Sequence, residues 1–140
     1  MEARVKWVEN VMFVAESGTG HSIVLDGAPE SGGKNLGMRP MELMALGVGS
    51  CSSYDVVTIL KKSRQKIISC EANVVAKRVD SEPAVFESIH LHFKLVGNNL
   101  SEKQVGRAIE LSAEKYCSAS IMLKNGGVKV THDFEIAELV

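Results

Sequence analysis

The sequence predicts a single α+β domain over residues 1–140, with elements in the order βββ-α-ββ-α-α-β. Three observations carry this prediction. Apolar and polar residues alternate with the period of a strand in segments near both ends of the chain. A long apolar segment that opens on a proline has the composition of a helix. Glycine-rich turns separate these segments, and a chain of this length suits one domain. Both kinds of element in one short chain are typical of an α+β domain.

The N-terminal segment is predicted to form three short strands. In ARVKWVEN, Val5 and Trp7 alternate with Arg4 and Lys6, which is the pattern of a half-buried strand. VMFVAES and HSIVLDG continue the strand character, and turn signals follow at SGTG and DGAPESGG. We therefore expect a three-stranded meander before the first helix.

The central segment is predicted to be one long helix from about Pro40 to about Lys62. Proline suits the first helical turn, and the lysines of KKSRQK suit its last turn because cations complement the helix dipole. Residues 43–48, LMALGV, are apolar on nearly every face. A helix of this kind is usually buried on all sides, and the rest of the chain is small. We therefore expect a homodimer that buries this helix between its subunits.

The C-terminal half is predicted to contain the remaining elements. IISCEANVVAKRV and AVFESIHLHFKLVG have strand character, and SEKQVGRAIELSAEKYC reads as a helix with Ser101 as its N-cap. A shorter helix from Cys117 ends at NGG, and VKVTHDFEIAEL closes the chain as a strand. His90 and His92 share one strand face. With no third ligand signal nearby, an exposed sheet face is favoured there, and no metal is expected.

Composition excludes several classes of partner. The formal net charge is −1, so the chain has no overall electrostatic signature of binding to nucleic acid or to an anionic membrane. Its apolar stretches fall short of the roughly 20 residues that span a bilayer. The N-terminus MEARVKWVEN lacks the basic and then apolar layout of a signal peptide. We therefore expect a cytoplasmic protein without nucleic-acid or membrane partners.

The three cysteines are the candidates for chemistry. Cys51, Cys70 and Cys117 form neither a C-x-x-C pair nor a zinc-binding spacing, so they are either inert core thiols or part of a reactive site. Cys70 reads as an inert sheet residue. The small residues around Cys51 either leave room near its sulfur or allow close helix packing. If a helix begins at Cys117 or Ser118, its dipole is expected to lower the pKa of the Cys117 thiol.

The pairing of RPMELMALGVGSC with a downstream SAEKYCSAS resembles the OsmC/Ohr family, the osmotically inducible and organic-hydroperoxide-resistance proteins. Within it the sequence is most similar to the short YhfA-like branch, over nearly the whole chain. The resemblance implies the OsmC-like fold, an intertwined α+β homodimer with its active sites at the subunit interface.

The resemblance also implies an activity, the thiol-dependent reduction of alkyl or fatty-acid hydroperoxides in defence against oxidative stress. By that resemblance Cys51 is the cysteine that attacks the peroxide, and Cys117 resolves it as a disulfide. No bound cofactor is implied, and an external lipoyl-type dithiol, carried by a lipoylated protein, is the expected reductant. The alternative is a non-enzymatic dimer of the same fold that binds a small apolar or electrophilic ligand at the subunit interface.

Family members stabilise the thiolate with an arginine that is held by a glutamate on the same helix as the cysteine. The family glutamate directly follows the proline, where this chain has Met41, and Glu42 comes one residue later. At about 100° per residue, Glu42 then lies on the helix face opposite Cys51. Glu42 is therefore a candidate either for the family role or for a first-turn acid that complements the helix dipole.

The activating cation has two candidates. Arg39 immediately precedes the helix, several turns from Cys51, so only a folded-back segment or a partner subunit could bring its guanidinium to the sulfur. Arg4 on the first strand is the other candidate. Asp55 lies one turn beyond Cys51 on nearly the same face. An unpaired carboxylate there would raise the thiol pKa, so Asp55 helps only by holding a cation between the two groups.

Overall fold

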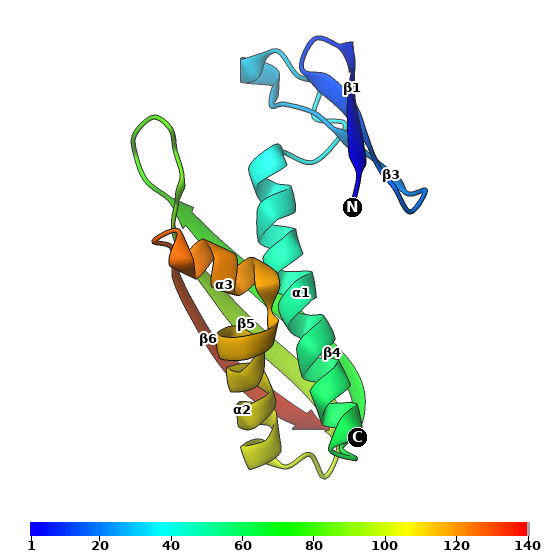
Figure 1. Cartoon of the computed structure of the whole chain (residues 1–140), viewed down its shortest axis with the longest axis vertical. Coiled ribbons are helices and arrows are strands. Elements are labelled where there is room, and N and C mark those ends of the chain that lie inside the picture. Colours follow the sequence, from blue (N-terminus) through cyan, green and yellow to red (C-terminus); the bar gives the residue numbers. More distant parts are fainter. Residues whose placement is uncertain (140) are drawn as a thin grey trace. The chain divides into compact units, whose positions relative to one another are not determined.

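The computed structural model describes residues 1–139, and it confirms the predicted α+β class and order of elements (Figure 1). The elements are β1 (Ala3–Glu9), β2 (Met12–Ser17), β3 (Ser22–Leu25), η1 (Pro29–Ser31), α1 (Pro40–Lys62), β4 (Lys66–Arg78), β5 (Phe86–Asn98), α2 (Glu102–Leu111), η2 (Ser112–Tyr116), α3 (Ser118–Asn125) and β6 (Lys129–Glu138). The chain divides into two compact units, the first spanning Met1–Met44 and the second beginning at Ala45. Each unit is described by itself.

The first unit is built on the antiparallel sheet β1-β2-β3, the meander that the sequence predicts. Its register pairs Val5 with Ala15 and Phe13 with both Trp7 and Leu25, so these side chains share one face. Trp7 is 62% exposed and Phe13 is 36% exposed, whereas Leu25 is the one buried apolar side chain of residues 1–44. The apolar face of this sheet is therefore largely uncovered within its own unit.

The loop after β3 is organised by a buried carboxylate. Asp26 is 3% exposed and accepts hydrogen bonds from the backbone N–H groups of Gly27, Lys34 and Leu36, at 2.8, 3.0 and 3.1 Å. The bond from Leu36 makes the largest contribution to lowering the pKa of Asp26 below its ordinary value. Asp26 therefore ties the two ends of this glycine-rich loop together and leads the chain toward α1.

The helix α1 has the bounds that the sequence predicts. One stripe of it is buried, consisting of Val48, Gly49, Ser52, Val56 and Leu60. At Gly49 an added Cβ would lie 2.7 Å from Val74 Cγ2, so the helix approaches β4 closely there. Leu46 is 51% exposed and Tyr54 is 73% exposed. A single chain therefore does not bury this helix on all sides, and the expected burial requires a second surface.

The composition of α1 has a second consequence. Among residues 1–139 it is the one helix long and apolar enough, by length and composition, to cross a membrane. The expectation that no stretch would reach that size is therefore wrong at the level of composition. The core helix of a soluble protein passes the same test, so length and hydropathy alone do not assign α1 to a bilayer.

The second unit is built on the sheet β4-β5-β6, with α1, α2 and α3 against one of its faces (Figure 1). β4 pairs antiparallel with β5, and β5 pairs parallel with β6. A parallel neighbour requires a crossover connection, which α2, η2 and α3 supply. The helix-facing residues of β5 form the centre of the core, and they are Ile89, Leu91, Phe93 and Leu95.

The crossover departs from the sequence prediction at one place. Ser101 caps α2 as predicted, and its Oγ accepts a hydrogen bond from the Gln104 N–H at 3.4 Å. The predicted helix through Cys117 ends earlier, at Leu111, and a π-helical turn, η2, follows it. This wider turn redirects the chain so that Cys117, with extended backbone, becomes the N-cap of α3.

The uncovered face of the second sheet carries the two histidines, side by side as predicted. His92 Nδ1 lies 2.6 Å from Asp133 Oδ1, and His90 Nε2 lies 3.1 Å from the same oxygen. His90 Nδ1 also pairs with Thr131 Oγ1 at 2.7 Å. The hydrogen bond to Asp133 raises the pKa of His92 above its ordinary value, and the reciprocal bond lowers the pKa of Asp133.

This histidine pair predicts a pH-dependent contribution to stability. Because the pKa of His92 is raised on folding, its contribution is complete below its unfolded pKa of 6.5 and is lost as the pH rises through the folded value. The contribution of Asp133 to stability is present above its unfolded pKa of 3.8. It is lost as the pH falls through the lowered pKa of the folded state. We therefore expect His92→Gln to lower the melting temperature more at about pH 5.5 than at about pH 9, as thermal denaturation measures.

The difference in melting temperature is expected to be modest. The His92 and Asp133 side chains are both partly exposed, so solvent screens their interaction. Glu135 also raises the pKa of His92. Its Oε1 lies 3.7 Å from His92 Nε2 and 3.5 Å from Lys94 Nζ. His21→Gln in the β2–β3 turn serves as the matched control. An equal loss at both pH values would contradict the assignment to His92.

Candidate functional site

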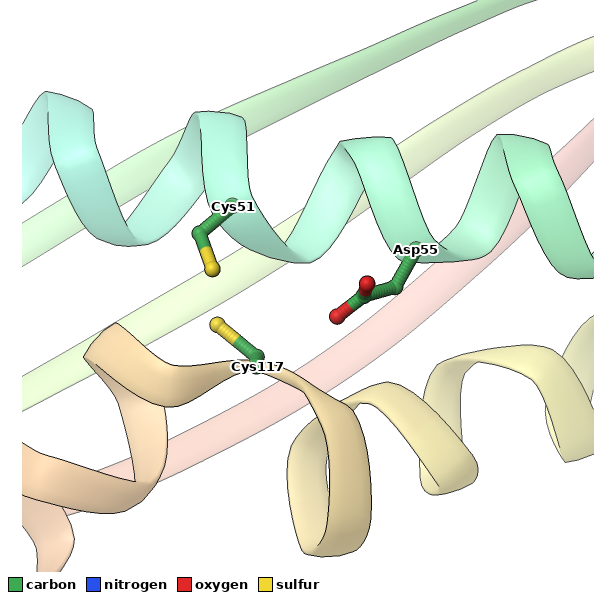
Figure 2. A group of neighbouring side chains, drawn as sticks. All are labelled: Cys51, Asp55 and Cys117. Carbon is green, nitrogen blue, oxygen red and sulfur yellow. The ribbon is translucent and has the colours of Figure 1, made fainter.

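Cys51 and Cys117 are brought together in the second unit. Cys51 lies in the middle of α1, and Cys117 is the N-cap of α3. Their sulfur atoms and a carboxylate oxygen of Asp55 all lie within 4.8 Å of one another. Figure 2 shows the three side chains pointing into the space between α1 and the η2–α3 segment. Residues that are far apart in the sequence therefore form one compact group, hereafter the thiol–carboxylate group.

Cys117 is the buried member of the thiol–carboxylate group, with 0% of its surface exposed. Its Sγ accepts hydrogen bonds from Ser52 Oγ at 3.2 Å and from the Ser120 N–H at 3.3 Å. Burial nevertheless raises the pKa of the Cys117 thiol, and proximity to Cys51 adds to the rise. α3 begins where the sequence predicts, but the expected lowering of the Cys117 pKa is wrong, because desolvation outweighs the N–H and hydroxyl donors.

Asp55 is the charged member of the thiol–carboxylate group. It lies one helical turn beyond Cys51, on the face that the sequence predicts, and is half-buried. Asp55 Oδ2 accepts a hydrogen bond from Ser112 Oγ at 3.1 Å, and the same hydroxyl lies 3.4 Å from the Ser52 carbonyl oxygen. Ser112 begins the π-helical turn η2. The turn that places Cys117 therefore also fixes the orientation of the Asp55 carboxylate.

Arg39 and Glu42 belong to the first unit and have structural partners there. The Arg39 guanidinium donates to the carbonyl oxygens of Gly37 at 2.9 Å and Asp26 at 3.4 Å. Glu42 Oε2 accepts a hydrogen bond from the Arg39 backbone N–H at 3.0 Å. Glu42 therefore has a backbone partner just ahead of α1, and both roles considered for it stay predictions. In residues 1–139 no ion pair joins the two side chains, and their catalytic role stays a prediction.

The small residues near Cys51 serve more than one purpose. Gly49 allows close packing on β4, as described above, whereas the Ser52 hydroxyl binds the Cys117 sulfur. Nothing lies within 4 Å of a Cβ added at Gly47. Cys70 is half-buried on β4, and burial raises the pKa of its thiol. Close packing therefore explains Gly49, although its neighbour is a strand, and the room expected near the Cys51 sulfur stays a prediction.

Sequence reasoning missed the serine hydroxyls that organise the site. The sequence alone predicts no hydrogen bond from Ser52 to Cys117 or from Ser112 to Asp55, and the structure shows both. The partners of Ser52 and Ser112 lie on other elements, 65 positions away for the Ser52–Cys117 bond and 57 for the Ser112–Asp55 bond. The one available signal is that a buried helix stripe contains hydroxyls, which need hydrogen-bond partners when they are buried.

Comparisons with known proteins agree with this geometry. Residues 32–133 match the family model described as "OsmC-like protein". The chain is 45% identical over 136 residues to Protein YhfA of Escherichia coli strain K12, covering 97% of this chain and 98% of that protein.

Two solved structures show the same fold. A hypothetical protein from Aquifex aeolicus VF5 is 30% identical, with a TM-score of 0.81 over 97% of this chain and 96% of that one. An organic hydroperoxide resistance protein OsmC from Legionella pneumophila is 17% identical, with a TM-score of 0.73 over 96% and 95% of the two chains. At that identity the second likeness concerns the fold alone.

Proposed function

Because this chain belongs to the OsmC-like family, we propose that it reduces organic hydroperoxides with a pair of cysteine thiols. The observation that carries the proposal is the distance between the Cys51 and Cys117 sulfur atoms, which is within 4.8 Å. A disulfide requires the two sulfur atoms to be about 2.05 Å apart, so rotation of one or both side chains would bring them into bonding distance. A structural neighbour is named an organic hydroperoxide resistance protein, which is consistent with an alkyl or fatty-acid hydroperoxide as substrate.

In the proposed first step the Cys51 thiolate attacks the terminal oxygen of the hydroperoxide. The O–O bond breaks, an S–O bond forms, and the alkoxide takes a proton to leave as the alcohol. Cys51 is thereby oxidised to a sulfenic acid. Cys51 is the better candidate for this step because it is partly exposed, whereas Cys117 is fully buried.

In the second step Cys117 attacks the Cys51 sulfenic acid, which releases water and forms a disulfide. An external dithiol of the lipoyl type, free or on a lipoylated protein, then reduces the disulfide by thiol–disulfide exchange. The dithiol leaves as its own disulfide, and both cysteines return to thiols. The cycle needs no resident cofactor and is proposed to run in the cytoplasm.

The proposal includes a homodimer. Proteins of this family are commonly dimeric. The apolar face of β1-β2-β3 is largely uncovered, and the exposed Leu46 and Tyr54 leave one side of α1 open. A second copy would bury both surfaces, since obligate interfaces resemble a core cut in half. It is also the proposed source of a cation beside Cys51, with Arg39 and Arg4 as the candidates.

An alternative function is favoured by one hollow in the first unit. It has a volume of about 350 Å³ and is lined by Val5, Phe13, Ala15, Leu25, Pro40 and Leu43. Every lining side chain is apolar, as in many sites that bind small apolar ligands. In this alternative the chain is a non-enzymatic dimer whose second copy closes over the hollow, so that a small apolar or electrophilic ligand binds at the subunit interface.

Turnover of cumene hydroperoxide with dihydrolipoamide as reductant separates the two functions. The peroxidase function predicts steady consumption of reductant, and one equivalent of hydroperoxide without reductant should remove two thiols per chain. Peptide mapping should then find the Cys51–Cys117 disulfide. Folded protein that shows no turnover and loses no thiols would contradict the peroxidase and favour the alternative.

A further inference from the structure

We propose that the reduced protein binds one thiophilic divalent cation of the zinc class through Cys51 Sγ, Cys117 Sγ and the Asp55 carboxylate. Two sulfur atoms and a carboxylate oxygen converge within 4.8 Å of one another (Figure 2). Thiolate and carboxylate ligands are those that zinc uses in proteins, and the soft sulfur atoms disfavour magnesium or calcium. The proposal does not depend on the peroxidase function.

The geometry needs little change to accept the ion. Zinc–sulfur bonds of about 2.3 Å in a tetrahedral site place two sulfur atoms about 3.8 Å apart. The two sulfur atoms would therefore approach each other by about 1 Å or less, and each would approach the carboxylate oxygen by about 1.3 Å or less, which rotation of the side chains can provide. Three protein ligands leave the fourth position for water or a small ligand, an arrangement typical of open rather than purely structural zinc sites.

The hydrogen-bond donors around the thiol–carboxylate group suit a bound cation. Asp55 receives the Ser112 hydroxyl at 3.1 Å, and Cys117 Sγ receives the Ser52 hydroxyl and the Ser120 N–H. These donors face the ligand atoms from outside the group. Outer-shell hydrogen bonds of this kind orient metal ligands and hold a carboxylate or thiolate in its charged form.

The electrostatics point the same way. A carboxylate beside two thiols disfavours a bare thiolate, whereas a cation among the three groups stabilises all of them. Binding would displace the two thiol protons to solvent and replace them with the metal. The ligands come from α1 and from the start of α3, so the site exists only in the folded chain.

Cobalt(II) is the direct probe, because it replaces zinc and its thiolate bonds absorb light. Protein reduced with a phosphine, which avoids competing thiols, is titrated with Co²⁺ and then with Zn²⁺. We expect thiolate-to-cobalt charge-transfer absorption that saturates at one ion per chain and disappears when zinc displaces it. Failure of the reduced wild-type protein to develop that absorption overturns the proposal without bearing on peroxidase turnover.

Variants assign the ligands. We expect Cys51→Ser and Cys117→Ser to remove the charge-transfer absorption or halve it, and Asp55→Asn to weaken zinc affinity by at least about tenfold in competition with a chromophoric chelator. Ser112→Ala should weaken zinc affinity by about tenfold, because the Asp55 carboxylate loses the hydroxyl that orients it. Cys70→Ser is the matched control and should bind as the wild type does. Wild-type affinity in Asp55→Asn, or loss of binding in Cys70→Ser, overturns the three-ligand site.

Discussion

Replacing Cys51 with serine is expected to lower hydroperoxide turnover by at least about 1000-fold, because the hydroxyl of serine cannot be oxidised to a sulfenic acid. Replacing Cys117 with serine is expected to have a different effect. The first oxidation of Cys51 should proceed, but its sulfenic acid then lacks the buried thiol that lies within 4.8 Å. Steady-state assays with cumene hydroperoxide measure the first effect, and trapping with dimedone followed by mass spectrometry measures the second.

Cys70→Ser is the matched control for both variants. Cys70 is half-buried like Cys51, but it lies on β4 and is outside the thiol–carboxylate group. Its replacement should leave turnover within about twofold of the wild type, as expected for a substitution away from the reacting atoms. Full activity in Cys51→Ser would contradict the proposed attack by Cys51. A sulfenic acid trapped on Cys117 instead would reverse the two roles.

Much of the fold could be predicted because it is encoded locally. Pro40, the lysine-rich end and the apolar segment between them define α1, and Ser101 marks the start of α2 by a capping bond that needs only nearby residues. The strand character of AVFESIHLHFKLVG likewise indicated β5, and the two-residue spacing of His90 and His92 indicated its exposed face. These signals act over a few residues, so a single sequence contains all of them.

The end of α2 could not be predicted in this way. The segment that follows Leu111 has good helix-forming composition, and nothing in SAEKYC requires a break. The π-helical turn there coincides with hydrogen bonds from Ser112 to groups on α1. Such contacts depend on a distant element, so tertiary structure overrides the local preference.

The site was predicted only in part, for a related reason. The pairing of Cys51 with Cys117 was implied by the family resemblance, and the position of Asp55 near Cys51 followed from helix geometry. The pKa of Cys117 was predicted in the wrong direction because the dipole of α3 can be read from sequence but the degree of burial cannot. The structural partners of Arg39 and Glu42 also depend on how the loop around Asp26 folds.

Replacing Phe93 with alanine is expected to lower the free energy of unfolding by about 3–5 kcal/mol, the largest stability effect that we predict. Phe93 is 1% exposed and lies on the central strand β5, where it pairs with Ala72 of β4 and Phe134 of β6. Its removal leaves a cavity at the middle of the sheet, because strands paired on both sides cannot close around it. Urea denaturation at fixed protein concentration measures the loss, since dimerisation would make stability depend on concentration.

Val75→Ala on β4 is the matched control, because Val75 is 68% exposed and lies on the uncovered face of the same sheet. Val75→Ala should lower the free energy of unfolding by no more than about 0.5 kcal/mol, since few contacts are removed. Phe93→Leu keeps most of the buried volume and should fold with an intermediate loss, so the comparison holds even if Phe93→Ala does not fold. A loss for Phe93→Ala no larger than that for Val75→Ala would contradict a core centred on β5. Phe93 lines a small cavity together with Ser52 and Ser112, which hydrogen-bond Cys117 and Asp55, so its removal is expected to loosen the approach of Cys51 to Cys117 as well.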